Sequence, residues 1–127
     1  MFNMIIAVSI GSVIGGLGRW FLSLKLNSLI TLLPLGTYLS NVIAGYIIGF
    51  SFAFFSQQTT LTPEWRLLIM TGLCGGLSTF STFSLEVMLS FQEGKVAQGI
   101  FEIFIHLSSS LLMTYLGILS YNLLQSK

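Results

Sequence analysis

Long stretches without a charged side chain constrain this sequence more than any other feature. Residues 1–18, 26–63 and 67–85 contain no Asp, Glu, Lys or Arg, and neither do residues 103–126. Charged residues make up only 7% of the chain, whereas a soluble globular domain carries roughly a quarter. We therefore predict an integral membrane protein.

The same composition excludes other classes of protein. The five Lys and Arg residues are scattered, with no two adjacent, so the basic patch that nucleic acid requires is missing and no nucleic-acid partner is expected. Cys74 is the only cysteine, which leaves no intrachain disulfide or cysteine-based metal site. No basic residue precedes Arg19, so we expect the first apolar segment to be a retained helix rather than a secretory signal.

The apolar stretches are long enough for four membrane-spanning helices of about 20 residues or more. Polar and proline-containing segments separate them, and Pro63 suits the first turn of the third helix. We predict an all-α fold, with residues 1–127 forming one four-helix transmembrane domain surrounded by lipid. The helices are expected at about residues 2–24, 37–56, 63–91 and 95–123.

The positive-inside rule does not decide how these helices are oriented in the membrane. Arg66 and Lys127 lie on one side, while Lys25, Lys95 and the borderline Arg19 lie on the other. This near tie is compatible with a protein oriented by other signals and with one that inserts both ways round. Since a chain this small must oligomerise to bury its polar residues, an antiparallel homodimer is one expectation.

Polar residues recur every four positions on the last three predicted helices, and residues at that spacing share one helix face. The stripes are Thr37 and Asn41 on the second helix, Ser78, Thr82 and Glu86 on the third, and Glu102, His106, Ser110 and Thr114 on the fourth. Such stripes either hold helices together by hydrogen bonds or line a polar path, and both interpretations stay open. For the small residues Gly11, Gly15, Gly45 and Gly49 we favour close helix packing.

The third predicted helix contains the most unusual segment. Gly75 and Gly76 weaken a helix in the middle of the membrane, and we expect a break near them. A break frees carbonyl groups that need partners inside a membrane, and exposed carbonyls are suitable ligands for a hard cation such as Na⁺. Residues 78–84, which follow, are rich in hydroxyls, and Phe80 and Phe83 share a helix face.

Enzymatic chemistry is not expected. The chain has no Asp and a single His, so a Ser-His-Asp triad is impossible, and no P-loop or paired metal ligands occur. His106 is interpreted as a structural or lining residue. Glu86 and Glu102 lie near predicted helix ends, where exposure at the membrane interface is expected. Arg19 is expected to snorkel to the interface or to pair with a carboxylate.

A lining of hydroxyls, one amide and phenyl rings suits an anion. Hydroxyl groups and the Asn41 amide donate hydrogen bonds, and the edges of phenyl rings carry partial positive charge. Without a fixed cation in the middle of the path, these donors bind an anion weakly enough to release it.

Three segments, GGLGRW, GTYLSNVIAGYIIG and GLCGGLSTFSTFSLE, resemble the Fluc (CrcB) family of bacterial fluoride channels, and the resemblance covers essentially the whole chain. It implies a passive, fluoride-selective channel of the bacterial inner membrane that exports fluoride from the cytoplasm and so reduces its toxicity. It also implies a dual-topology antiparallel homodimer with two pores and a structural Na⁺ on the dimer axis.

The resemblance further assigns roles to individual residues. Phe80 and Phe83 would be the paired phenylalanines of the pore, and Asn41 its amide. The implied fluoride pore consists of Asn41, Phe80, Phe83, Ser81, Thr82, Ser110, Thr114 and Glu86. The backbone carbonyls of Gly75 and Ser78, from both subunits, would bind the Na⁺.

Two alternative functions stay open at this point. A small multidrug-resistance exporter has similar length and dual topology, but it needs an acidic residue within its first helix for proton exchange, where this chain has Arg19. A structural subunit of a larger membrane complex is the other alternative, and it would conduct no ions by itself.

Overall fold

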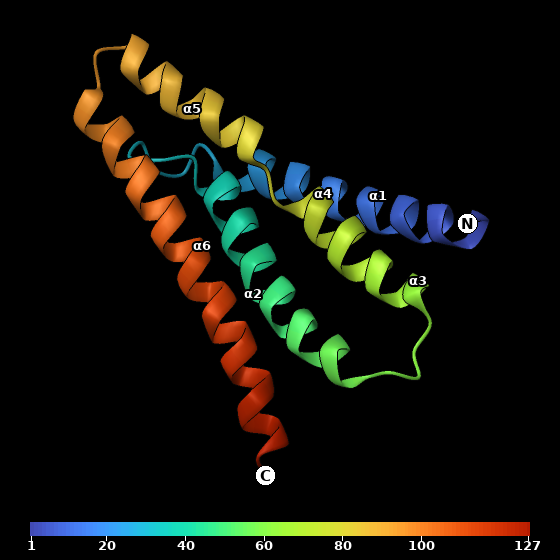
Figure 1. Cartoon of the computed structure of the whole chain (residues 1–127). Coiled ribbons are helices and arrows are strands. Elements are labelled where there is room, and N and C mark those ends of the chain that lie inside the picture. Colours follow the sequence, from blue (N-terminus) through green and yellow to red (C-terminus); the bar gives the residue numbers. More distant parts are fainter.

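The computed structural model describes all 127 residues, which form helices joined by short connections (Figure 1). Four segments are long and apolar enough to span a membrane, namely Phe2–Leu26, Leu35–Gln57, Pro63–Gln92 and Val96–Gln125. They begin and end within two residues of the predicted ranges. The predicted all-α fold with four transmembrane helices is confirmed.

The first, second and fourth spans are single helices, whereas the third span is divided. The helices are α1 (Phe2–Leu26), α2 (Leu35–Gln57), α3 (Pro63–Arg66), α4 (Gly75–Leu77), α5 (Phe80–Gln92) and α6 (Val96–Gln125), with a π-helical segment (Leu67–Cys74) between α3 and α4. Pro63 lies in the first turn of α3 as predicted, although the Thr62 side chain makes no capping hydrogen bond. In the turn between α5 and α6, Gly94 has a φ of 79°, a conformation that glycine adopts at little cost.

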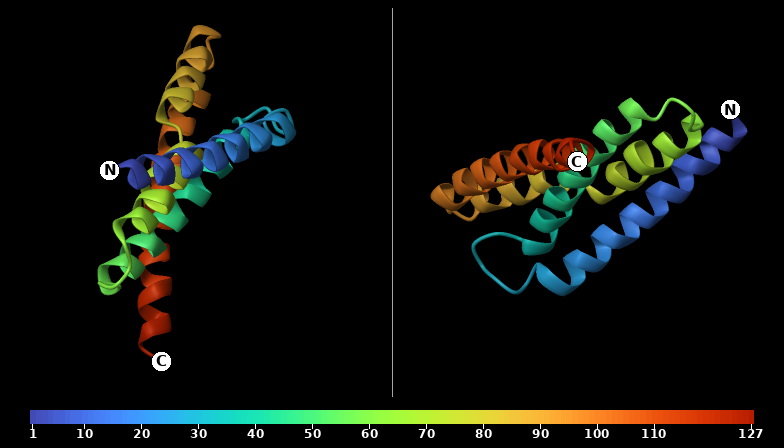
Figure 2. Two further views of the ribbon diagram at one scale, coloured as in Figure 1. Left: turned by 90° about the vertical axis from the view of Figure 1, so that its right-hand side faces the viewer. Right: turned by 90° about the horizontal axis from the view of Figure 1, so that it is seen from below.

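α1 packs along the first half of the third span through small residues (Figure 2). A Cβ atom on Gly72 would lie 2.8 Å from the Gly11 Cα, and one on Gly76 would lie 2.9 Å from the amide nitrogen of Gly16. These distances leave no room for a side chain, so the two backbones are in direct contact. The packing role expected for Gly11 and Gly15 is confirmed.

α2 and α6 also pack through glycines. A Cβ atom on Gly45 would lie 3.0 Å from the carbonyl oxygen of Ser110, and one on Gly49 would lie 2.9 Å from the carbonyl carbon of Thr114. The packing role expected for these two glycines is therefore confirmed. It places the polar stripe of α6 directly against α2.

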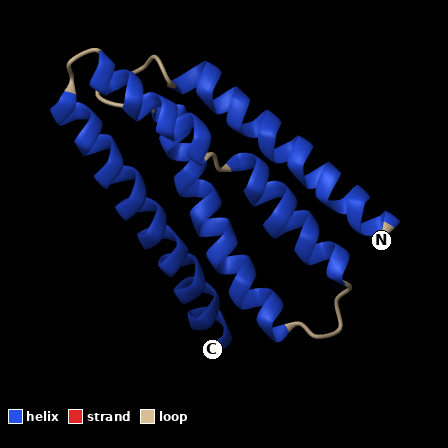
Figure 3. Cartoon of the chain, turned by 45° about the horizontal axis from the view of Figure 1, so that its top comes forward, coloured by secondary structure: helices blue, strands red, loops and turns tan.

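The third span is interrupted between α4 and α5, as Figure 3 shows. Ser78 and Thr79 have extended backbones, with ψ angles of 153° and 118°, whereas Gly75 and Gly76 are helical. The expected break is thus present, and it begins two residues after Gly76. Gly76 has a different use, because its lack of a side chain lets α1 approach closely.

After the break, α5 packs chiefly against α6, and this hairpin projects away from α1 (Figure 2). Large apolar side chains on these two helices are exposed, to 71% for Phe80, 67% for Phe104 and 72% for Leu111. In a membrane, such a surface faces either lipid or another protein chain.

Candidate ion pathway

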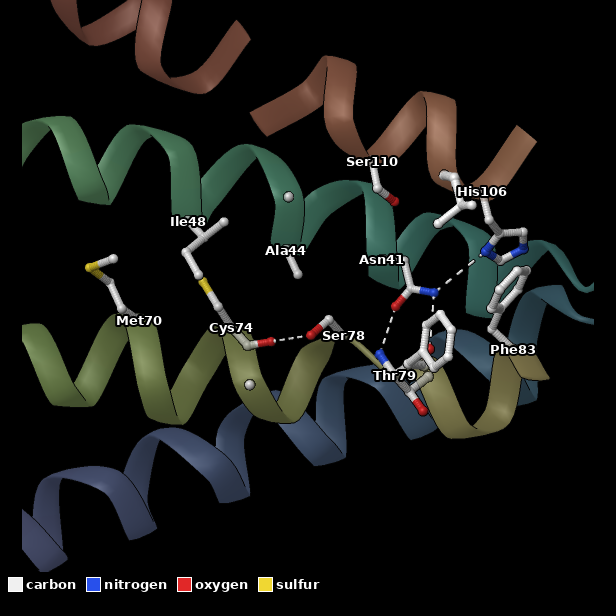
Figure 4. A pocket seen from close by; sticks show the side chains of 14 residues that line it. Asn41, Ala44, Ile48, Met70, Cys74, Ser78, Thr79, Phe83, His106 and Ser110 are labelled. Atoms are coloured by element: carbon white, nitrogen blue, oxygen red, sulfur yellow. Dashed lines mark hydrogen bonds between the residues drawn. The ribbon is translucent and has the colours of Figure 1, made fainter. Parts of the chain in front are cut away.

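A cavity of about 330 Å³ lies beside the break, between α2, the third span and α6 (Figure 4). Its polar lining consists of Asn41, Ser78, Thr79, His106 and Ser110. Phe80 and Phe83 add two aromatic rings, and no charged side chain lines the cavity. Residues that are far apart in the sequence therefore meet in an uncharged, partly polar space.

Asn41 binds the extended backbone at the break. The amide of Thr79 donates to Asn41 Oδ1 at 2.6 Å, and Asn41 Nδ2 donates to the Thr79 carbonyl at 3.2 Å. Two backbone groups that have left the helical hydrogen-bond pattern are satisfied in this way, as they must be inside a membrane. Thr79 also caps α5, because its hydroxyl accepts from the amide of Thr82 at 3.2 Å.

His106 is buried among aromatic rings at one end of the cavity. Its ring lies 4.5 Å from that of Phe83, with 32° between the ring planes, and meets the edge of Tyr38 at 5.4 Å. The Nδ1 atom of His106 lies 3.5 Å from Asn41 Nδ2. The amide nitrogen of Asn41 can only donate. His106 thus lines the cavity and packs in it, as the sequence predicted.

The two phenylalanines predicted to be paired are neighbours but differ in environment. The ring centres of Phe80 and Phe83 are 5.5 Å apart. Phe83 is 6% exposed and packs against His106, whereas Phe80 is 71% exposed. Phe80 therefore lies at the open edge of the cavity, on the surface of the chain.

The predicted hydroxyls are distributed between the cavity and its surroundings. Ser110 lines the cavity. Thr114, one turn further along α6, donates its hydroxyl to the Ser110 carbonyl at 3.0 Å. Ser81 is exposed at the start of α5, with its hydroxyl 3.4 Å from that of Thr79. Of the hydroxyl residues predicted to belong to the pore, Ser81, Thr82 and Thr114 therefore lie outside the cavity lining.

The carbonyl groups predicted to bind Na⁺ have lost their helical partners. In a continuous helix, the Gly75 carbonyl would accept from the amide of Thr79, and the Ser78 carbonyl from that of Thr82. These amides donate instead to Asn41 Oδ1 and to Thr79 Oγ1. Gly75 and Ser78 are also exposed on the surface of the chain. Because freed carbonyl oxygens are hard ligands, these two residues fit a hard cation such as Na⁺.

Arg19 contributes to the break in a way that the sequence did not predict. Its Nε atom donates to the Gly76 carbonyl at 3.0 Å, and Arg19 makes no ion pair, so the expected pairing with a carboxylate is wrong. In a continuous helix that carbonyl would accept from the amide of Phe80, and the extended residues between them prevent this bond. The Arg19 side chain takes the place of the missing donor.

Glu86 and Glu102 are held inside the bundle. Glu102 is only 2% exposed and accepts from the Ser90 hydroxyl at 3.0 Å. Glu86 is half-buried and accepts from the Thr37 hydroxyl at 2.8 Å. The expectation of exposure at the interface is wrong for Glu102, because the α5–α6 hairpin turns its side chain toward Ser90 of α5.

Comparison with known proteins identifies the family. Residues 6–118 match the family described as "CrcB-like protein, Camphor Resistance (CrcB)". This chain belongs to the CrcB family.

The relatives of this CrcB chain include several named proteins of nearly equal length. It is 51% identical to the fluoride-specific ion channel FluC of Pseudomonas aeruginosa (strain UCBPP-PA14), over 100% of both chains. It is 55% identical to the channel of the same name from Paraburkholderia phymatum, over 93% of this chain and 94% of the relative. The relatives are ion channels by name, and not enzymes. With four helices of spanning length, this CrcB chain is a multi-pass protein of the bacterial inner membrane.

The CrcB fold gathers only part of the predicted site in the cavity. The cavity contains Asn41, Phe80, Phe83 and Ser110, together with Gly75 and Ser78. Two contributors were not predicted, namely Thr79, whose backbone binds Asn41, and Tyr38, which packs on His106. Tyr38 had no signal in the sequence, and Thr79 stood out only as one hydroxyl among several.

Proposed function

We propose that this CrcB-family chain forms a fluoride-selective channel through which the ion passes passively. The observation that carries the proposal is the meeting of Asn41, Phe83 and Ser110 in an uncharged cavity at the helix break. The name of its relatives, fluoride-specific ion channel, supports fluoride as the ion.

The chemistry of the cavity suits a small anion. Ser110 offers a hydroxyl donor, and the ring edges of Phe80 and Phe83 carry partial positive charge. No Lys or Arg lines the cavity, so the anion is held by neutral donors that can release it quickly. The proposed path continues past the cavity along Thr114 on α6 and along Ser81, Thr82 and Glu86 on α5.

The proposed assembly is an antiparallel homodimer with two pores. Exposed apolar side chains along α5 and α6, including Phe80 at 71%, support a second chain against this face. The near-even division of basic residues between the two membrane sides supports insertion in both orientations. In this assembly the partner subunit would close the open edge at Phe80.

We also propose a structural Na⁺ bound by the carbonyls of Gly75 and Ser78 from each subunit. Both carbonyls have lost the amide donors of a continuous helix, which is the support for this proposal. A bound Na⁺ would supply positive charge that stabilises the break. The side chains of Asn41 and Arg19 also bind backbone carbonyls at the break.

The direction of net transport would follow the fluoride gradient. Fluoride enters cells as its neutral acid and dissociates in the less acidic cytoplasm, where the anion is trapped. A passive channel then lets the anion leave, which reduces fluoride toxicity without ATP or a coupling ion.

Efflux from liposomes that contain only this protein tests the proposed function. We expect rapid fluoride efflux and much slower chloride efflux, with protein-free liposomes as the control. Equal rates for both anions would contradict the proposed selectivity. Absence of any flux from correctly folded protein would instead favour a structural subunit, and proton-coupled transport of a cationic drug would favour an exporter.

A further inference from the structure

A second cavity lies between the beginning of α1 and the beginning of the third span, which Figure 1 shows side by side. Its volume is about 510 Å³, within the range of about 300–1,000 Å³ that small-molecule sites occupy. Asn3 of α1 lines it together with Thr62, Glu64 and Trp65. We refer to this cavity as the α1–α3 groove.

The α1–α3 groove is polar at the membrane surface and apolar below it. Both spans begin on the same side of the membrane, because the chain crosses twice between their first residues. Beyond the polar residues at these two ends, the groove is lined by Ile6 and Ile10 of α1 and by Leu68 of the third span. Ile10 lies seven residues after Asn3, which is about 10 Å along a helix. A phospholipid has the same order, with its polar headgroup at the surface and its acyl chains below.

The groove offers an unpaired negative charge and an open aromatic face. Glu64 is the only charged side chain in its lining and makes no ion pair within the chain. Trp65 is 53% exposed, and no cation of the chain lies over its ring, since the single cation–π contact is that of Lys25 with Phe21. A carboxylate and an indole face both attract a cation.

A zwitterionic phospholipid with an ammonium headgroup satisfies each of these features. Its ammonium group would lie against the Glu64 carboxylate and the Trp65 ring. The Asn3 amide and the Thr62 hydroxyl can donate to its phosphate. An anionic headgroup without an ammonium group would instead place its negative charge beside Glu64, where no Lys or Arg lines the groove to compensate it.

The position of the groove leaves it open to lipid. It lies at the end of the third span that is remote from α5 (Figure 1), and the α5–α6 hairpin, against which we propose that a second chain packs, projects away from α1 (Figure 2). Ile6 and Ile10 are 40% and 50% exposed. In a bilayer, apolar side chains exposed in this way contact acyl chains.

We propose that the α1–α3 groove binds one phospholipid with an ammonium headgroup, such as phosphatidylethanolamine. Glu64 and Trp65 hold the ammonium group, and the apolar part of the groove holds an acyl chain. The site does not depend on ion conduction, so it stands or falls separately from the proposed channel function.

Fluorescence quenching by phospholipids with brominated acyl chains tests the site, because bromine quenches an indole that it contacts. The chain has two tryptophans, Trp20 and Trp65, so Trp20→Phe leaves only the indole of the groove. The full-length protein is placed in mixed bilayers of phosphatidylethanolamine and phosphatidylglycerol with matched chains, with bromine on one lipid or on the other. We expect a preference of about two- to fivefold for phosphatidylethanolamine at Trp65, the strength of a surface ion pair.

Two further variants in the Trp20→Phe background show whether the carboxylate causes this preference. Glu64→Gln should abolish it. Glu93→Gln, which changes an exposed glutamate outside the groove, is the matched control and should retain it. A preference that survives Glu64→Gln in the folded protein would overturn the proposal.

Trp65→Phe supplies a control for the location, because it leaves Trp20, which is 61% exposed and lies outside the groove. Trp20 should be quenched equally by the two brominated lipids. Equal quenching of Trp65, or stronger quenching by phosphatidylglycerol, would overturn the proposal. No quenching of Trp65 by either lipid would show that protein covers the groove, which would overturn it as well.

Discussion

The two halves of the chain hold their helices together in different ways. α1 and the first half of the third span meet through glycines, so that backbone packs on backbone and no side chain intervenes. After the break, α5 and the residues that lead into it meet α2 and α6 through polar side chains such as Asn41, Thr37 and Glu102. Continuous helices satisfy their own backbone groups, whereas a broken helix does not. Polar side chains are therefore found where the backbone needs partners, and small residues where it does not.

Gly72→Val should have the largest effect on stability, because it disrupts the glycine contacts between α1 and the third span. A Cβ atom at this position would lie 2.8 Å from both the Gly11 Cα and the Val8 carbonyl oxygen. We expect a loss of about 3 kcal/mol or more in the free energy of unfolding, measured by denaturant titration in detergent. Gly16→Val is the matched control, since a Cβ there meets no atom within 4 Å. Equal stability of the two variants would refute the backbone-contact interpretation.

Asn41→Ala removes the side chain that binds the break and should have the next largest effect on stability. It leaves the amide and the carbonyl of Thr79 without partners, which should cost about 2 kcal/mol in the free energy of unfolding. Asn122→Ala, at an exposed position of α6, is the control and should change little. Hydrogen exchange at the Thr79 amide should rise in the Asn41 variant alone, and an unchanged exchange rate would contradict the proposed contact.

Phe83→Ile and Phe80→Ile should slow fluoride efflux while the protein stays folded. Each removes a ring edge but keeps apolar bulk, and a loss of about 1 kcal/mol in anion stabilisation corresponds to roughly fivefold in rate. Phe83→Ile should also lower stability slightly, because Phe83 packs on His106, whereas the exposed Phe80 should not matter for folding. Phe104→Ile, exposed and outside the cavity, is the control. Wild-type efflux in both pore variants would count against the ring-edge interpretation.

Ser126→Cys should leave the fold unchanged and report the orientation of the subunit. The position is exposed near the carboxyl end, and the native Cys74 is buried. In a Cys74→Ala background, we expect a membrane-impermeant thiol reagent to label Ser126→Cys from each side in about half of the molecules, as dual topology requires. Labelling from one side only would show a single orientation and exclude the antiparallel homodimer. Cys74→Ala alone is the control and should not be labelled.

Much of the first half was predictable from residue spacing. The close approach of α1 to the third span follows from glycines four residues apart, because that spacing places them in one line on a helix. The break was also predicted, but its position at Ser78 and Thr79 was not. Gly76 remains helical because its contact with α1 requires it there, and Asn41 binds the extended residue that follows.

The polar half was less predictable. Arg19 was expected to snorkel to the membrane interface or to pair with a carboxylate, and the bond from its Nε atom to the Gly76 carbonyl was not predicted. Glu102 was expected at the interface, and it is 2% exposed. In both cases the partner depends on which helices are neighbours, and the local sequence around each residue does not predict those neighbours.

The sequence by itself determined that this chain lies in a membrane, that it crosses four times and that it is not built for catalysis. Those properties depend on local composition and on the length of apolar runs relative to the thickness of a bilayer. Only the tertiary structure decided that Asn41 binds Thr79, that Arg19 replaces a lost helical donor and that Ser90 donates to Glu102. These contacts join residues on different helices, and their partners follow from helix packing rather than from any local pattern.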